Sequence, residues 1–126
     1  MSKPMIISHP MAAVAIDARK FVKQDGSGAV TTNDGAATAI GISESKADNS
    51  ATPDYKYKAE DIGVIKQGIV TVPVTAAAAY NIGDVVELDT DGQTVKAGTT
   101  NPIGTAAETK TTASGDLGLK VYVNFA

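Results

Sequence analysis

The chain contains no cysteine, no tryptophan and a single histidine, His9. Without cysteine it can form neither a disulfide bond nor a thiolate metal site, and it has no thiol nucleophile. One histidine cannot supply a multi-histidine metal site within one chain. His9 also lies in a proline-flanked segment, where we expect it to be solvated or lightly packed. These absences lead us to expect a protein that is not an enzyme and that binds no cofactor and no metal.

Charge and hydropathy argue against two further classes of protein. The 126 residues carry 11 basic and 14 acidic side chains, a net charge of −3, and no lysine or arginine block that could neutralise phosphates. No apolar run approaches the ~18 residues that a membrane-spanning helix needs. Between Pro4 and Pro10 the apolar run is only two or three residues long, too short for the apolar region of a secretory signal. We expect no nucleic-acid partner, no membrane partner and synthesis in the cytoplasm.

Aromatic residues are scarce, so the core must be built from small side chains. Phe21, Phe125 and four tyrosines are the only aromatics. Small side chains bury little apolar area each, at about 25 cal/mol per Å². A chain of 126 residues is most simply one domain. Because such a domain gains from burying more surface against copies of itself, we expect it to oligomerise.

The chain contains an internal repetition of one pattern. Residues 81–107 give a turn, a strand, a tight Asp-Gly hairpin, a second strand, a short loop and a third strand, and residues 21–44 give the same order of signals. The matched positions are Val22 with Val86, Asp25 with Asp89, Val30 with Val95, Gly35 with Gly98, and Ile40-Gly41 with Ile103-Gly104, at offsets of 63 to 65. Such a period indicates one supersecondary unit used twice in one core. The alternative is chance similarity among segments rich in glycine, threonine and alanine.

The remaining signals are those of an all-β protein. We expect strands over residues 20–24, 29–32, 37–43, 68–74, 85–88, 93–97, 103–107 and 118–125. Residues 25–28 and 89–92 predict tight hairpins, and Gly41 indicates a bulge or a close backbone approach. Residues 12–18 fit either a short strand or a helical turn, and the alanines of residues 75–80 predict one helical turn. Short strands at regular intervals are typical of a small barrel or a sandwich.

Residues 1–11 predict an extended N-terminal arm that precedes a single β domain over residues 12–126. Pro4 and Pro10 favour extended geometry. The centre of the arm, Met5, Ile6 and Ile7, is apolar. An extended apolar segment is suited to docking, either on its own barrel or on a partner as an added strand.

Residues 45–61 are polar, mixed in charge and interrupt the repeated pattern, so we interpret them as an insertion loop. Long loops in compact domains are usually functional or flexible. Tyr55 and Tyr57 alternate with lysines in this loop, which favours a short edge strand with both tyrosines on one face. They are candidates for an interface.

No motif points to catalysis or to a bound ion. Asp89 and Asp91 precede Gly92 as in a calcium loop, but position twelve counted from Asp89 is Thr100 where that loop needs a glutamate. A tight hairpin explains the same residues. A lipoyl or biotin carrier barrel would carry a modifiable lysine at a hairpin tip, and neither hairpin has one.

The second half of the chain resembles a known family. The features that carry the resemblance are Thr71-Val72-Pro73-Val74, residues 76–80, Ile82-Gly83-Asp84-Val85-Val86, Pro102-Ile103-Gly104-Thr105-Ala106, Ser114-Gly115-Asp116 and Leu119-Lys120-Val121-Tyr122-Val123. Over about residues 70–126 they are similar to the head decoration, or capsid cement, proteins of tailed bacteriophages. The first half of the chain shares this resemblance only through its own similarity to the second half, and residues 45–61 depart from the family's pattern.

The resemblance implies a barrel or β-tulip-like domain with the internal strand–hairpin–strand duplication and the extended N-terminal arm. It implies a structural protein of the virion, typically a homotrimer, on the exterior of the expanded head and bound to the major capsid protein. It carries over no catalytic residue. The arm would contact the shell, and its candidate contact residues are Pro4, Met5, Ile6, Ile7, Pro10 and Met11.

Two alternatives remain open at this point. The chain could be another structural β module of a virion, from a fibre or a baseplate. It could also be a small-ligand-binding or carrier β-barrel, which would contain an apolar pocket or a modified lysine.

Overall fold

The computed structural model describes residues 4–35, 39–51, 59–75, 77–112 and 118–125, and these residues form strands and turns without any helix. The strands are β1 (Met5–Pro10), β2 (Ala15–Ile16), β3 (Phe21–Gln24), β4 (Val30–Thr32), β5 (Gly41–Ser43), β6 (Ala47–Asp48), β7 (Asp61–Pro73), β8 (Ala79–Tyr80), β9 (Val85–Leu88), β10 (Val95–Ala97), β11 (Pro102–Ala106), β12 (Lys110–Thr111) and β13 (Gly118–Asn124). The predicted all-β class is therefore confirmed. In the described part of the chain no helix is long and apolar enough to cross a membrane.

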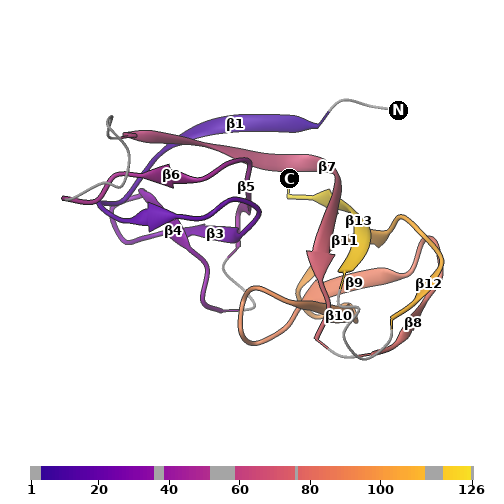
Figure 1. Ribbon diagram of the computed structural model, residues 1–126. Coiled ribbons are helices and arrows are strands. Elements are labelled where there is room, and N and C mark those ends of the chain that lie inside the picture. The colour runs from indigo at the N-terminus through magenta and orange to yellow at the C-terminus, as the bar shows by residue number, and fades with distance from the viewer. Residues whose placement is uncertain (1–3, 36–38, 52–58, 76, 113–117, 126) are drawn as a thin grey trace.

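One strongly curled antiparallel sheet organises the molecule. Its strand order is β10-β9-β11-β13-β7-β5-β3-β4, and β1 pairs with β7 beside this path. Two short ladders, β2 with β6 and β8 with β12, lie outside it. Figure 1 shows two lobes, one formed by the indigo to magenta segments and one by the orange to yellow segments, with the long strand β7 running from one to the other.

The two lobes are two copies of one unit. The pairings of β3 with β4 and β5 match those of β9 with β10 and β11. The β2–β6 ladder matches β8–β12, and β5 with β7 matches β11 with β13. The first part of β7 pairs with β1 as β13 pairs with the second part of β7. The predicted duplication is confirmed and extends beyond the matched segments, so that the described residues fall into a first repeat within 5–67 and a second repeat within 68–125.

Each repeat closes on itself through one parallel bridge. In the first repeat Met11 bridges Val30, and in the second Val74 bridges Val95. The next residue along the chain donates its backbone N–H to the carbonyl of the bridged valine. Ala12 donates to Val30 and Thr75 donates to Val95, at 2.9 Å in both repeats. The two repeats therefore form two small barrels that share β7.

Backbone conformation repeats at the turns as well. Gly28 and Gly92, 64 residues apart, have φ angles of 86° and 74° in the two hairpins. Arg19 and Gly83, also 64 residues apart, have φ angles of 59° and 94°. Positive φ is uncommon for a residue with a side chain. Arg19 adopts it because its turn copies the geometry that a glycine provides in the second repeat.

The Ile-Gly pair of the repeated pattern has a packing role. A Cβ on Gly104 would overlap the carbonyl oxygen of Tyr122, and a Cβ on Gly41 would lie 2.7 Å from the carbonyl oxygen of Ile65. Tyr122 and Ile65 occupy equivalent places in the strands paired with β11 and β5. The close backbone approach predicted at Gly41 is confirmed and occurs in both repeats.

The helical turn predicted over residues 75–80 is wrong. Ala79 and Tyr80 form β8, which pairs antiparallel with β12. The Tyr80 side chain is only 2% exposed. Strand pairing and the burial of Tyr80 outweigh the high helix propensity of the alanines, which is a weak preference compared with tertiary contacts. Of the two structures considered for residues 12–18, the strand is the one observed, as β2.

Residues 45–61 are not a loop throughout, because they contain β6, whose two residues are buried. Asp48 of β6 corresponds to Thr111 of β12, an offset of 63, whereas Val64 corresponds to Val121, an offset of 57. The first repeat is therefore six residues longer between these points, and the insertion follows β6.

The predicted match of Gly35 with Gly98 is wrong. The backbone N–H of Gly98 donates to the Val85 carbonyl, and the equivalent bond runs from Asn33 to the Phe21 carbonyl. Asn33, and not Gly35, is therefore the counterpart of Gly98. The sequence match fails here because the following connection is two residues longer in the first repeat.

Buried side chains form two clusters. The interior of the first repeat contains Met11, Ile16, Val22, Val30, Ala47, Ile62 and Val64. The second cluster contains the interior of the second repeat together with three residues of the first, Phe21, Ile42 and Ile65. These three lie on the outer face of the first barrel, so the second repeat packs against that face.

Candidate functional site

The N-terminal segment, the first candidate contact surface, is a paired strand. Residues 5–10 form β1, which runs antiparallel to the first part of β7, with Ile6 opposite Ile65 and Ile7 opposite Val64. Of the two docking possibilities that the sequence left open, the described residues show docking on the chain's own domain. In Figure 1, β1 lies along β7 at the top of the molecule.

The candidate contact residues of this segment differ in exposure. Met5, Ile6 and Ile7 expose 42%, 40% and 42% of their surfaces. Pro4 and Pro10 are exposed as well. Among the described residues β7 is the only strand that pairs with β1, so no other described strand covers the second edge of β1. An exposed apolar edge strand is a template for pairing with another chain.

Met11 differs from the other candidates, because its side chain is only 6% exposed and belongs to the core of the first repeat. His9 is half-buried, and its enclosed Nε2 atom has no hydrogen-bond partner among the residues that the structure describes. Burial, and then the positive charge of Lys66, lowers the pKa of His9. His9 is thus partly packed, and its enclosed Nε2 atom departs from the solvated or lightly packed position that the sequence led us to expect.

The contact between the two repeats is a second surface, and Gln93 is its polar anchor. Its side-chain oxygen accepts from the Phe21 backbone N–H at 3.0 Å, and its Nε2 donates to the carbonyls of Phe21 and Asn33 at 2.9 and 2.8 Å. The Asn33 side chain donates in return to the Gly92 carbonyl at 3.0 Å. The rings of Phe21 and Phe125 meet edge to face, with centroids 6.2 Å apart. The β9–β10 hairpin and the end of β13 thus cover the first repeat.

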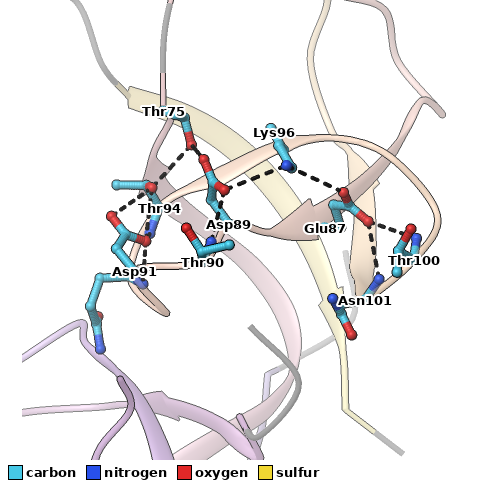
Figure 2. A network of polar contacts seen from close by, with 10 residues as sticks. Thr75, Glu87, Asp89, Thr90, Asp91, Thr94, Lys96, Thr100 and Asn101 are labelled. Carbon is cyan, nitrogen blue, oxygen red and sulfur yellow. Dashed lines mark hydrogen bonds and ion pairs between the residues drawn. The ribbon is translucent and has the colours of Figure 1, made fainter. Parts of the chain in front are cut away.

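A polar network fixes the hairpin that presents Gln93 (Figure 2). Asp91 Oδ1 accepts from the backbone N–H groups of Gln93 and Thr94, both at 2.9 Å. The Asp89 carboxylate accepts from the hydroxyl of Thr75 at 2.7 Å. This bond, followed by one from the Thr90 backbone, lowers the pKa of Asp89. The acidic residues therefore act as turn caps, as the hairpin interpretation predicts.

Glu87 extends the same network across the hairpin. It is 7% exposed, and its carboxylate accepts from the backbone N–H groups of Thr100 and Asn101 at 2.6 and 3.0 Å. Lys96 lies between Glu87 and Asp89, 3.9 and 3.4 Å from their carboxylate oxygens. Among the described residues no three His, Asp or Glu side chains are placed to share a metal ion.

The outer face of the second repeat is a third surface. Val85, Thr105, Tyr122 and Ile69 are direct cross-strand partners in that order, so their side chains share one face. Val85 and Tyr122 are each 38% exposed and Ile69 is 52% exposed. A groove of about 290 Å³ lies on this face, lined by Val85, Pro102, Ile103, Gly104, Thr105, Tyr122 and Asn124.

The sequence analysis named the first of these surfaces and missed the other two. Gln93 stands in a hairpin where polar residues are ordinary, so no sequence signal marks it as an anchor. The apolar outer row of the second repeat could have been found from the alternation of Val85 and Tyr122 with buried neighbours. Tyr55 and Tyr57, the predicted interface loop, lie outside the described residues.

In comparisons with known proteins, no family model matches the chain and no curated protein matches it in sequence.

Proposed function

We propose that this protein is a structural, non-enzymatic decoration protein of a tailed-bacteriophage head. In this proposal it binds the exterior of the expanded capsid as a homotrimer and stabilises the shell by bridging neighbouring copies of the major capsid protein. It is made in the host cytoplasm and ends in the virion.

The observation that carries the proposal is the edge strand β1. It presents three large apolar side chains, each about 40% exposed, beside an edge without a partner in the described part of the chain. Monomeric proteins usually protect such an edge with charge, proline or a covering loop. Pro4 and Pro10 stand at its two ends, and its centre, Met5–Ile7, contains no charged residue.

Strand addition gives this edge a way to bind a capsid. A segment of the major capsid protein that pairs with β1 would gain main-chain hydrogen bonds, and Met5 and Ile7 would enter pockets on one side of the new strand. The β1 strand is already held on β7, so less entropy is lost on binding than for a free arm. A homotrimer would present three such edges, and simultaneous contacts raise avidity by ~100-fold or more where geometry permits.

The resemblance of residues 70–126 to capsid cement proteins supports the same function, and the duplicated barrel supplies the rigid body that a cement protein needs. The packed contact between the repeats, with Gln93 bonded to Phe21 and Asn33, makes the two barrels one unit. A rigid unit transmits a contact at one edge to the whole decoration layer.

The test is binding to expanded tailed-phage heads that lack decoration and carry the cognate major capsid protein. We expect the unmodified protein to sediment with these heads at micromolar concentration and to be visible on their exterior by electron cryomicroscopy. Ile6→Asp should weaken binding at least about tenfold, because it places a charge in the strand that would be paired.

Ile82→Asp is the matched control, because Ile82 is 69% exposed and lies in a turn of the second repeat, away from β1. Equal binding by the Ile6 and Ile82 variants would reject β1 as the contact strand. Failure of the unmodified protein to bind at micromolar concentration would reject the function itself. A location on the tail would assign it to the fibre or baseplate instead.

A further inference from the structure

The two repeats differ in the exposure of one equivalent row of residues. The row lies on the outer face of each barrel and consists of Phe21, Ile42 and Ile65 in the first repeat, and of Val85, Thr105 and Tyr122 in the second. In the first repeat all three side chains are at most 2% exposed. In the second, Val85 and Tyr122 are each 38% exposed and Thr105 is half-buried. The next residue along the row, Ile6 in the first repeat and Ile69 in the second, is exposed in both, at 40% and 52%. The same face is thus covered in one repeat and open in the other.

The cover of the first repeat comes from a defined part of the second. The β9–β10 hairpin lies across the face, with Gln93 bonded to the backbone of Phe21 and Gly92 packed against Asn33 and Gly35. A Cβ on Gly92 would lie 2.6 Å from the Gly35 nitrogen, so the two backbones are in contact. The segment of the first repeat that corresponds to this hairpin is the β3–β4 hairpin, because Asp25 and Gly28 correspond to Asp89 and Gly92 in their backbone hydrogen bonds.

We propose that the outer face of the second repeat binds the β3–β4 hairpin of a second copy of this chain. The contact repeats between molecules the packing that already joins the two repeats within one molecule. It is heterologous, since a hairpin of one copy meets a face of the next, so successive copies add head to tail until a ring closes. The inference does not depend on capsid binding.

The β3–β4 hairpin has an exposed and rigid tip that could bind another molecule. Asp25, Gly26 and Ser27 at its tip are exposed. The Asp25 carboxylate accepts from the Ser27 N–H and hydroxyl at 2.9 and 2.8 Å and from the Ala29 N–H at 3.0 Å, so the tip is rigid. A preorganised loop loses little entropy when it binds. The groove of about 290 Å³ beside Val85 and Tyr122 offers it a concave apolar seat.

The contact between copies should be weaker than the one within the chain. Gly28 and Ala29 correspond to Gly92 and Thr94, so the first hairpin has no counterpart of Gln93 and lacks its three hydrogen bonds. We therefore expect reversible association with a Kd between about 1 µM and 1 mM, the range of a modest interface.

Sedimentation velocity over a concentration series up to about 1 mM tests whether the face associates. The unmodified protein should form larger species as concentration rises, and Tyr122→Lys should raise the apparent Kd at least about tenfold. Ile69→Lys is a second variant on the same face, in case Tyr122→Lys does not fold. Ile82→Lys is the control, because it adds the same charge at an exposed turn residue that is not part of this row. Association unchanged by both face variants, or no association of the unmodified protein, would overturn the proposal.

Cross-linking tests the direction of the contact, which is simple to read because the chain has no cysteine. Ser27→Cys labels the hairpin tip, and Thr99→Cys labels the place that corresponds to Asp34, where Gly92 packs within the chain. With a short bismaleimide linker, a mixture of the two single variants should give dimers that each contain one copy of both. Either variant alone should give none. Dimers of Thr99→Cys with itself, or an unreactive mixture, would show that the hairpin does not bind this face.

Discussion

Replacing Gly104 with alanine should destabilise the protein strongly, although the change adds a single methyl group. Gly104 lies in β11 opposite Val123, within the continuous sheet. A Cβ at this position would overlap the Tyr122 carbonyl oxygen and would lie 2.9 Å from the carbonyl carbon and 3.0 Å from the Val123 Cα. All three atoms belong to the backbone of β13, so no side chain can rotate away to make room.

The expected cost follows from what must move. Overpacking of a well-packed site costs about 1–3 kcal/mol. Separating β11 from β13 enough to fit a methyl group also weakens roughly two ladder hydrogen bonds, each contributing about 1 kcal/mol. We therefore expect Gly104→Ala to lower the free energy of unfolding by about 3–5 kcal/mol, a large share of the about 5–15 kcal/mol that a domain has.

Urea unfolding followed by circular dichroism measures this loss. With a slope of about 1–3 kcal/mol per M, a loss of 3 kcal/mol moves the midpoint down by about 1–3 M. Gly41→Ala should behave alike, since it faces the equivalent carbonyl of Ile65. Gly26→Ala is the matched control, because a Cβ there meets nothing within 4 Å, and we expect a change within about 0.5 kcal/mol or a slight gain. A Gly104→Ala midpoint close to that of Gly26→Ala would refute the close-approach argument.

Two further predictions concern the inter-repeat contact and the edge strand. Gln93→Ala should cost about 2–4 kcal/mol in urea unfolding, because it removes the acceptor of the Phe21 N–H and the donor to the Phe21 and Asn33 carbonyls. Hydrogen exchange of the Phe21 amide should accelerate, and an unchanged exchange rate would contradict the anchoring role. Burial and the charge of Lys66 lower the pKa of His9 in the folded protein. The unfolded chain therefore binds more protons at His9 below its ordinary pKa of about 6.5. The free energy of unfolding should then fall as the pH drops through 6.5 toward the lower folded pKa. His9→Val should remove this pH dependence, and a stability profile identical to that of the unmodified protein between pH 7 and pH 5 would show that His9 does not contribute to it.

Local chemistry determines the parts of the fold that the sequence predicts well. The two hairpins follow from turns that start at Asp25 or Asp89 and end at Gly28 or Gly92, glycines with a positive φ that few other residues adopt. The duplication follows from the same turns and from Gly41 and Gly104, where a side chain would press on the backbone of the neighbouring strand. Gly41 and Gly104, and Gly28 and Gly92, have the same residue type in both repeats, so a comparison of the chain with itself reveals them, whereas Arg19 and Gly83 do not match in type.

Long-range packing decides the parts that could not be predicted. Tyr80 turns an alanine-rich segment into a strand because it is buried and pairs with Lys110 in β12, a contact 30 residues away that no local propensity encodes. The second repeat also buries Phe21, and Gln93 bonds to its backbone from 72 residues away. The candidate contact strand was predictable in part, since Met5–Ile7 is apolar between prolines, whereas its pairing with β7 depends on register that only the fold supplies.

The differences between the repeats are as informative as their similarities. A duplicated chain buries one outer face where its halves meet and leaves the equivalent face open, so the two rows of side chains have different surroundings. The buried row uses Phe21 and Ile42, which have no polar atom, while the open row places Val85 and Thr105 at the same positions. A smaller apolar residue and a hydroxyl lower the cost of exposure to water while keeping area for contact, as expected of a face that is free in one state and covered in another. Thr105→Ile places in the open row the residue type that Ile42 has in the buried row, and should therefore lower the Kd for association between copies. The same sedimentation series measures this change. A variant that associates no more strongly would argue that the row is only a solvent-exposed surface.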